Sequence, residues 1–158
     1  YHDGETQNAD SVKNDKSKAY KTKSGKTVYG GGGITPDYFV ALDTSGFTIN
    51  SAKVYAKGII GNYAYTYYLQ NLPQLKAYKT PGEFVKTFVI SDDSWKQFVT
   101  LAAKDSITLN TITAKEKADL TNRISSSIAR QLWRTEGMIE VLNVNDVTIK
   151  KALEVLGK

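Results

Sequence analysis

The side chains that most often perform catalysis are scarce in this sequence. It contains no cysteine and a single histidine, His2. Disulfides, thiolate nucleophiles and iron–sulfur clusters require cysteine, and a multi-histidine metal site or a serine–histidine triad requires histidine. These chemistries are excluded within the chain. We expect it to hold no catalytic, cofactor-binding or metal-ligating set and to need no cofactor.

Two glycine-containing segments match phosphate-binding loops only in part. Ser24–Thr27 has the end of a P-loop, but that motif needs a glycine five residues before Gly25, where Tyr20 stands. Gly30–Gly33 leads into Ile34–Pro36, whereas a phosphate cradle feeds a helix N-terminus with free amides. We interpret the first segment as a hairpin turn and reject the second as a phosphate site.

Six of the ten tyrosines gather between residues 55 and 78. Such a cluster can stack sugar rings or bases, but tyrosines more often pack half-buried with the hydroxyl at the rim. We favour packing over ligand binding for this cluster, which comprises Tyr55, Tyr63, Tyr65, Tyr67, Tyr68 and Tyr78.

Asp92 and Asp93 form a carboxylate pair beside an expected helix start, where negative charge stabilises free amides. A glycosidase pair needs two carboxylates facing each other across a cleft, which a sequence does not show. Serines and lysines are plentiful, so composition leaves a serine–lysine dyad open. No serine lies in the Gly-x-Ser-x-Gly pattern of a nucleophile elbow.

The chain has the length of one ordinary domain, 158 residues, and a net charge of +5. Eighteen of its 21 basic residues are lysines spread along the sequence, whereas nucleic-acid binders usually gather arginines and aromatic residues on one surface. We favour a solvated lysine-rich surface and expect no nucleic-acid partner. No apolar run approaches the roughly 20 residues of a membrane span, so we expect no membrane span.

The N-terminal third predicts a polar tail and short strands. Residues 1–16 are too polar to bury a core. Residues 19–23 and 26–29 are β-prone, and Ser24-Gly25 between them predicts a two-residue hairpin turn. After the glycines we predict a short buried strand over Tyr38–Val40 and a loop over Ala41–Phe47.

From residue 50 the apolar spacing becomes helical. We predict a helix over 51–71 that Gly58 and Gly61 weaken and Pro73 ends. A helical turn over 81–87, an extended link over 88–90 and a helix over 92–104, capped by Ser91 or Asp92, follow.

The clearest helix start is Thr113-Ala114-Lys115-Glu116, which fits a capping box. We predict a helix from there to about Arg134, with Leu120, Ile124, Ile128 and Leu132 along its buried stripe. A short helix over 136–142 and a last one over 147–156 follow. Asp146 caps the last helix, Gly157 ends it, and its expected inward residues are Val147, Ile149, Ala152, Leu153 and Leu156.

These elements predict an α+β fold that is mainly α: a short β-hairpin and strands on the N-terminal side, then a helical C-terminal domain. The change of pattern at 41–50 separates residues 1–40 from residues 41–158.

Residues 25–37 carry the most distinctive pattern, Gly-Lys-Thr-Val-Tyr-Gly-Gly-Gly-Gly-Ile-Thr-Pro-Asp. It resembles the closing segment of the catalytic core in carboxyl-terminal-processing (tail-specific) serine peptidases, which has a strand, then Gly-Ile-x-Pro-Asp, then a short apolar strand. The four glycines and the upstream segment 1–12 are similar to the Bacteroidetes branch. Similarity to that branch's helical C-terminal tail extends over Ile128–Trp133, Glu136-Gly137, Val141–Asn143 and Lys151–Leu153.

The resemblance implies a parent hydrolase with a serine nucleophile and a neutral lysine base, both preceding the motif at Gly30–Asp37. No serine or lysine of this chain matches those positions, so we expect no catalytic residue here. Tyr1, which is not an initiator methionine, suggests a cut inside a longer protein.

On this interpretation residues 1–40 are the closing insertion and strands of the protease core, and 41–158 is a domain that braces the core or mediates assembly. The implied partners are the rest of the core and protein or peptide substrates of the parent enzyme, and the implied location is the periplasm or cell envelope. The unpaired strand edges of residues 17–40 also predict a homodimer of the isolated chain. The first alternative is a free-standing binding module that uses the tyrosine-rich helix for peptide or glycan. A nucleic-acid binder ranks third, and salt-dependent binding of an oligonucleotide would favour it.

Overall fold

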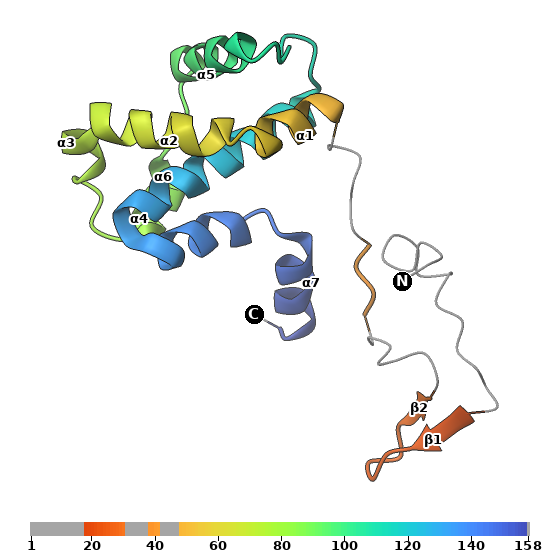
Figure 1. The fold of residues 1–158 in the computed structure, drawn as a ribbon. Coiled ribbons are helices and arrows are strands. Elements are labelled where there is room, and N and C mark those ends of the chain that lie inside the picture. The colour runs from red at the N-terminus through yellow and green to blue at the C-terminus, as the bar shows by residue number, and fades with distance from the viewer. Residues whose placement is uncertain (1–17, 31–37, 42–47, 158) are drawn as a thin grey trace. The chain divides into compact units, whose positions relative to one another are not determined.

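The computed structural model describes residues 18–30, 38–41 and 48–157. Over these residues the fold is mainly helical, with seven helices and one two-stranded antiparallel sheet (Figure 1), which confirms the predicted fold class. The chain divides into two compact units, residues 1–43 and 44–158. The predicted tail over 1–16, most of the glycine run and most of the loop over 41–47 lie outside the described residues.

The predicted hairpin is present in the first unit. Strand β1 (Ala19–Lys21) pairs antiparallel with β2 (Thr27–Tyr29), with Tyr20 opposite Val28. The predicted two-residue turn is wrong. The Thr22 amide donates to the Lys26 carbonyl at 2.8 Å and the Gly25 amide donates to the Thr22 carbonyl at 2.9 Å, so the loop spans 23–25. Its last position needs a left-handed backbone, which Gly25 supplies at φ +84°.

The strand predicted over Tyr38–Val40 is wrong. These residues have no strand conformation, and Tyr38 is 59% exposed. An apolar run becomes a strand only when a neighbouring strand accepts and donates its main-chain hydrogen bonds. The β1–β2 sheet, the one sheet among the residues described, offers this run no pairing.

Two helices stand where the sequence predicted one over 51–71. Helix α1 (Ile49–Ala56) begins at Thr48, whose hydroxyl accepts from the Ser51 amide at 3.2 Å. Helix α2 (Ile59–Gln70) begins after Gly58, whose φ of +65° interrupts the helical path. Helix α3 (Leu72–Leu75) follows, with Pro73 in its first turn.

The next two helices begin and end at the residues that the sequence predicted. Helix α4 (Pro81–Thr87) is followed by a link over 88–90 without regular structure, and α5 (Asp92–Lys104) begins after it. The Ser91 hydroxyl is the cap of α5, because it accepts from the Ser94 amide at 3.2 Å.

Helix α6 (Ala114–Asn143) is the central element of the second unit, and α2 and α4 pack against it (Figure 1). Its predicted stripe is confirmed at Leu120, Ile124 and Ile128, which are buried, while Leu132 is only partly buried against the core. The predicted break near Arg134 is also confirmed, since Arg134 has φ 56° and ψ −138° inside the element. The buried core around α6 includes Val54, Ile59, Tyr63, Leu75, Phe84, Phe98, Ile107, Leu109 and Ala129.

Helix α7 (Val147–Val155) has the predicted caps but not the predicted burial. The Asp146 carboxylate accepts from the amides of Thr148 and Ile149 at 2.8 and 3.0 Å, and Gly157 follows the helix at φ +68°. The inward placement is wrong, because α7 has no buried residue. Amphipathic spacing shows which face is apolar and does not show whether another element covers it. The five exposed residues are Val147, Ile149, Ala152, Leu153 and Leu156.

In the part of the chain that the structure describes, no helix combines the length and the apolar character that crossing a membrane requires.

Candidate functional site

The described residues of the two segments that partly matched phosphate loops, Ser24–Thr27 and Gly30, lie at the hairpin. Ser24–Thr27 forms its turn and the start of β2, as interpreted from the sequence. At Gly30 a Cβ atom would lie 3.0 Å from Cε2 of Tyr20, so the missing side chain lets the Tyr20 ring approach the backbone. Residues 31–33 lie outside the described residues.

The carboxylate pair lies in the first turn of α5, as expected for charges that favour free amides. Asp93 forms an ion pair with Lys96 at 3.0 Å, and Asp92 one with Lys117 at 3.5 Å. All four side chains are substantially exposed. Among the described residues no group of three or more His, Cys, Asp and Glu side chains is placed to hold a metal ion. His2 lies outside those residues.

The tyrosine cluster separates into three environments. Tyr63 is buried, and its hydroxyl donates to the Ser94 carbonyl at 2.6 Å. Tyr55 and Tyr65 are exposed, while Tyr67, Tyr68 and Tyr78 are partly buried against the core. Packing therefore accounts for most of the cluster. Two members, Tyr67 and Tyr78, also line a pocket.

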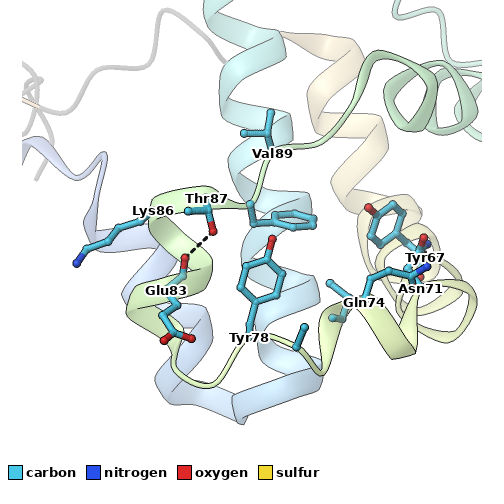
Figure 2. Close-up of a pocket in the computed structure, with 11 residues that line it drawn as sticks. Tyr67, Asn71, Gln74, Tyr78, Glu83, Lys86, Thr87 and Val89 are labelled. Atoms are coloured by element: carbon cyan, nitrogen blue, oxygen red, sulfur yellow. Dashed lines mark hydrogen bonds between the residues drawn. The ribbon is translucent and has the colours of Figure 1, made fainter.

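That pocket, the α2–α4 pocket, has a volume of about 700 Å³ and lies between the end of α2, α3 and α4. In Figure 2 the Tyr78 ring stands at its centre, with Tyr67 and Asn71 toward one end and Lys86 and Thr87 toward the other. Its lining comprises Tyr67, Asn71, Gln74, Leu75, Ala77, Tyr78, Glu83, Lys86, Thr87, Phe88 and Val89.

Aromatic rings form the rigid part of the pocket. Phe88 has edge-to-face contacts with Tyr67 and Tyr78, with ring centroids 6.1 and 6.3 Å apart. Phe84 lies behind them, stacked on Phe88 at 4.2 Å and edge-on to Trp133 of α6 at 5.7 Å. Each such pair stabilises the fold by roughly 0.5–1.5 kcal/mol in addition to the stabilisation from the surface area that it buries. The pocket is therefore held in shape by the core behind it.

Three polar side chains of the pocket, Asn71, Glu83 and Thr87, already bond to the local backbone. The Glu83 carboxylate accepts from the Lys79 amide at 2.8 Å. The Thr87 hydroxyl donates to the Glu83 carbonyl at 2.9 Å, and the Asn71 side-chain amide donates to the Tyr67 carbonyl at 2.9 Å (Figure 2 shows the first of these two). The pocket therefore presents chiefly apolar surface to a ligand.

Sequence reasoning missed the residues that position the pocket. Thr80 and Glu83 begin α4 together, since the Thr80 hydroxyl accepts from the Glu83 amide at 3.2 Å while the glutamate reaches back to the Lys79 amide. The signal was present, because Thr80-Pro81-Gly82-Glu83 has capping-box spacing with proline at the first helical position. No local signal brings Phe88 beside Tyr67, since that contact depends on how α2 and α4 pack on α6.

A second pocket, the α4–α6 groove, lies beside the first and has a volume of about 450 Å³. Its apolar lining comes from α4, the 88–90 link and part of α6, and most of its polar lining comes from α6. Phe88 and Val89 line both pockets. The groove is lined by Phe84, Val85, Phe88, Val89, Ile90, Ala114, Lys117, Ala118, Thr121, Asn122, Ser125, Val141, Val144 and Asn145.

The one buried carboxylate among the described residues, that of Glu116, has a different environment. It accepts hydrogen bonds from the hydroxyls of Thr48 and Ser51. The Thr113 hydroxyl accepts from the Glu116 amide at 3.1 Å, which is half of the predicted capping box. The other half is wrong, because the Glu116 side chain crosses to α1 instead of returning to its own helix start. Both hydrogen-bond partners of the carboxylate are hydroxyls that connect α1 to α6, so we interpret Glu116 as a structural residue.

Comparison with known proteins connects the second unit to a family. The sequence pattern of a family of unknown function, DUF8443, matches residues 51–134, just over half of the chain. The chain belongs to DUF8443. No curated protein and no solved structure matches the chain. The DUF8443 region contains the whole α2–α4 pocket, from Tyr67 to Val89, and ends at the kink of α6, before α7.

Proposed function

We propose that this chain is the non-catalytic C-terminal portion of a carboxyl-terminal-processing serine peptidase, and that its helical unit braces the protease core or mediates assembly. The observation that carries the proposal is the segment 25–37, with its similarity to the closing motif of that core. In support, β2 ends at Tyr29 directly before the glycines, the place where the resemblance requires a strand.

The hairpin also has the form of an incomplete sheet. Two strands alone are marginal in water, because each has one edge without main-chain partners. In the proposed parent enzyme, further strands of the core would pair with β1 or β2. The resemblance of segment 25–37 to this peptidase family also leads us to assign the parent enzyme to the periplasm or cell envelope.

The test begins with the coding sequence directly upstream, which we expect to encode a core with a serine nucleophile and a lysine base. That core, expressed with the present chain in trans, should copurify with it and cleave an unfolded polypeptide. A fluorophosphonate probe should label the core and leave the present chain unlabelled. An upstream frame without such a core, or labelling of this chain above a boiled control, would contradict the proposal.

A matched pair of variants tests the role of the hairpin. Val28→Pro removes the main-chain donor opposite Tyr20 and should abolish copurification with the core. Val28→Thr keeps that donor and a β-branched side chain, so it should copurify as the native chain does. The helical unit should keep the same thermal unfolding midpoint in both variants, since α1–α7 belong to the other unit.

The α2–α4 pocket favours a second function, binding of a peptide or glycan by the helical unit. Its aromatic surface, its volume of about 700 Å³ and its place within the DUF8443 region support this candidate. Pockets of roughly 300–1,000 Å³ with aromatic linings are typical of ligand sites. Titration with a peptide and with an oligosaccharide, monitored by tyrosine and tryptophan fluorescence, tests it. If neither the peptide nor the oligosaccharide binds, this second function is excluded.

A further inference from the structure

The link between α4 and α5 runs extended along the surface and leaves main-chain groups unpaired. It leaves α4 at Phe88 with φ −76° and ψ 126° and enters α5 at Ser91 with φ −66° and ψ 160°. The Phe88 amide donates to the Phe84 carbonyl at 2.8 Å. The amides of Val89 and Ile90 have no acceptor within the described ranges, and neither of their carbonyls has a donor there.

Burial alternates along this link as it does along an edge strand. Phe88 is partly buried and Ile90 is buried, whereas Val89 is 77% exposed. Consecutive main-chain groups of an extended chain point in opposite directions. Since the Phe88 amide points into the end of α4, the N–H and C=O groups of Val89 are directed to the opposite edge. That edge can accept one more strand.

The two pockets flank this same link. Phe88 and Val89 contribute to the α2–α4 pocket and to the α4–α6 groove. Successive side chains of an extended peptide point to opposite faces. The residue opposite Val89 would face solvent as Val89 does, and the residues on either side of it would face the protein, where the two pockets lie. Main-chain hydrogen bonds supply affinity in this mode of recognition, and side-chain pockets supply specificity.

The chemistry of the lining favours a polypeptide over a glycan. Of the polar lining, Glu83, Thr87 and Asn71 already bond to the local backbone, and the unpaired main-chain groups of Val89 match those of a polypeptide, which a glycan does not have. The charged group at the rim without a partner among the described residues is Lys86. An acidic residue beside the apolar ones would therefore complement the site.

We propose that an extended polypeptide segment pairs with Val89 as an added strand. The two large apolar side chains on either side of the residue opposite Val89 occupy the α2–α4 pocket and the α4–α6 groove, and an acidic residue lies near Lys86. The proposal rests on the binding function proposed for the α2–α4 pocket and specifies its ligand and its mode of binding.

The probe is a fluorescein-labelled peptide, Gly-Glu-Phe-Thr-Leu-Thr-Glu-Gly, titrated with the full chain and followed by fluorescence anisotropy. Val89→Pro removes one main-chain donor and should weaken binding about tenfold, the effect of roughly one hydrogen bond. Phe88 already has the extended backbone that a residue before proline adopts, and the Val89 amide has no intramolecular acceptor among the described residues, so the fold should remain. Val89→Ala keeps the donor and should change binding less than about twofold.

Pocket-filling variants separate this proposal from the binding function on which it rests. Ala77→Trp in the α2–α4 pocket and Ser125→Trp in the α4–α6 groove should each weaken binding of the peptide about tenfold or more. Leu153→Lys on the exposed face of α7 controls for unspecific apolar adhesion and should leave binding unchanged. If Ala77→Trp weakens binding while Val89→Pro and Val89→Ala behave alike, the pocket binds peptide but the added strand is wrong.

Three further outcomes would overturn the proposal. The first is absence of peptide binding at about 1 mM chain, the limit of weak affinity. The second is binding of a soluble hexasaccharide in place of the peptide, which would favour a glycan site. The third is that Leu153→Lys abolishes peptide binding while the pocket variants Ala77→Trp and Ser125→Trp leave it unchanged. An N-methylated peptide, which cannot donate to the Val89 carbonyl, should bind more weakly than its parent.

Discussion

The Ser51 hydroxyl donates a hydrogen bond of 2.6 Å to the carboxylate of Glu116, which joins the first turn of α1 to the first turn of α6. The Thr48 hydroxyl donates to the same oxygen. Glu116 is 1% exposed, so its negative charge lies buried between two helix N-termini. Helix N-termini favour negative charge, and the two hydroxyls supply the hydrogen bonds that a buried carboxylate requires.

Replacing Glu116 by alanine should lower the free energy of unfolding by about 2–3 kcal/mol. The reason is that the buried Ser51 hydroxyl loses its acceptor, which costs about 1–3 kcal/mol, and that the buried Glu116 side chain leaves unfilled space. Glu116→Gln keeps an acceptor oxygen and should cost less. Glu140→Ala, an exposed glutamate of the same element, should change stability by less than about 0.5 kcal/mol. Urea unfolding of the three variants measures this, and an equal effect of Glu116→Ala and Glu140→Ala would contradict the shared-carboxylate account.

Gly137 should tolerate no side chain. A Cβ atom there would lie 2.7 Å from the carbonyl oxygen of Ala129 and 3.0 Å from Cβ of Trp133, because α6 folds back on itself after its kink. Gly137→Ala should therefore destabilise the chain by about 1–3 kcal/mol through forced backbone shifts.

Gly61 is the matched control for this substitution. It lies inside α2, and a Cβ atom added there would meet no other atom within 4 Å. Gly61→Ala should stabilise the chain by about 0.5–1 kcal/mol, since alanine restricts the unfolded chain more than glycine does. Thermal unfolding should show midpoints that move in opposite directions, and midpoints that fall together would mean that the fold-back after Arg134 is wrong.

Ile128 tests the buried face of α6. It is fully buried, and truncation of a core isoleucine to alanine costs about 2–5 kcal/mol. Gln131 lies three positions further along the same helix and is exposed, so Gln131→Ala should have little effect. Calorimetry of the two variants compares the faces directly. Comparable losses of stability would show that the face is misassigned.

Tyr63 should make stability depend on alkaline pH. Burial raises the pKa of Tyr63 above its ordinary value of 10.0, so the folded state favours the neutral phenol. The resulting stabilisation is fully present below pH 10 and is lost as the pH rises through the raised pKa. Unfolding free energies measured between about pH 8 and 11.5 should fall at the upper end. Tyr63→Phe should reduce this fall, whereas Tyr65→Phe, at an exposed position, should leave it unchanged.

The β1–β2 hairpin should pair with a second copy when the chain is isolated. Every residue of β1 is exposed, and a two-stranded sheet keeps one free edge on each strand. Edge-to-edge pairing of two copies gives a symmetric dimer. Hydrogen exchange over 18–30 should then show protection that falls with dilution. Fast exchange at every concentration, or protection independent of concentration in a monomer, would rule the dimer out.

Local signals account for the parts of the fold that were predicted correctly. A capping hydroxyl or carboxylate and the residues it serves are two to four positions apart, so Ser91, Thr113 and Asp146 indicate their helices without knowledge of the rest of the chain. The break at Arg134 and the left-handed Gly157 follow from equally local patterns. Gly58 is also visible in the sequence, but its left-handed backbone divides the helix instead of only weakening it.

The candidate site was visible only in part. The density of tyrosines marks residues 55–78 in the sequence, yet Tyr63 is buried in the core and Tyr65 is exposed to solvent. The ring that joins Tyr67 to Tyr78 is Phe88, from a link that the sequence marked only as extended.

The sequence by itself determined the helical character of residues 48–157, the caps, the buried stripe of α6 and the hairpin. Each of these depends on hydrogen bonds or apolar spacing between residues close in the chain. The tertiary structure decided that the Glu116 side chain serves α1, that Tyr38–Val40 is not a strand and that the apolar face of α7 stays uncovered. It also decided that Val89 lies between two pockets. The physical reason is that pairing and burial need a second surface, and the identity of that surface depends on packing between segments far apart in sequence.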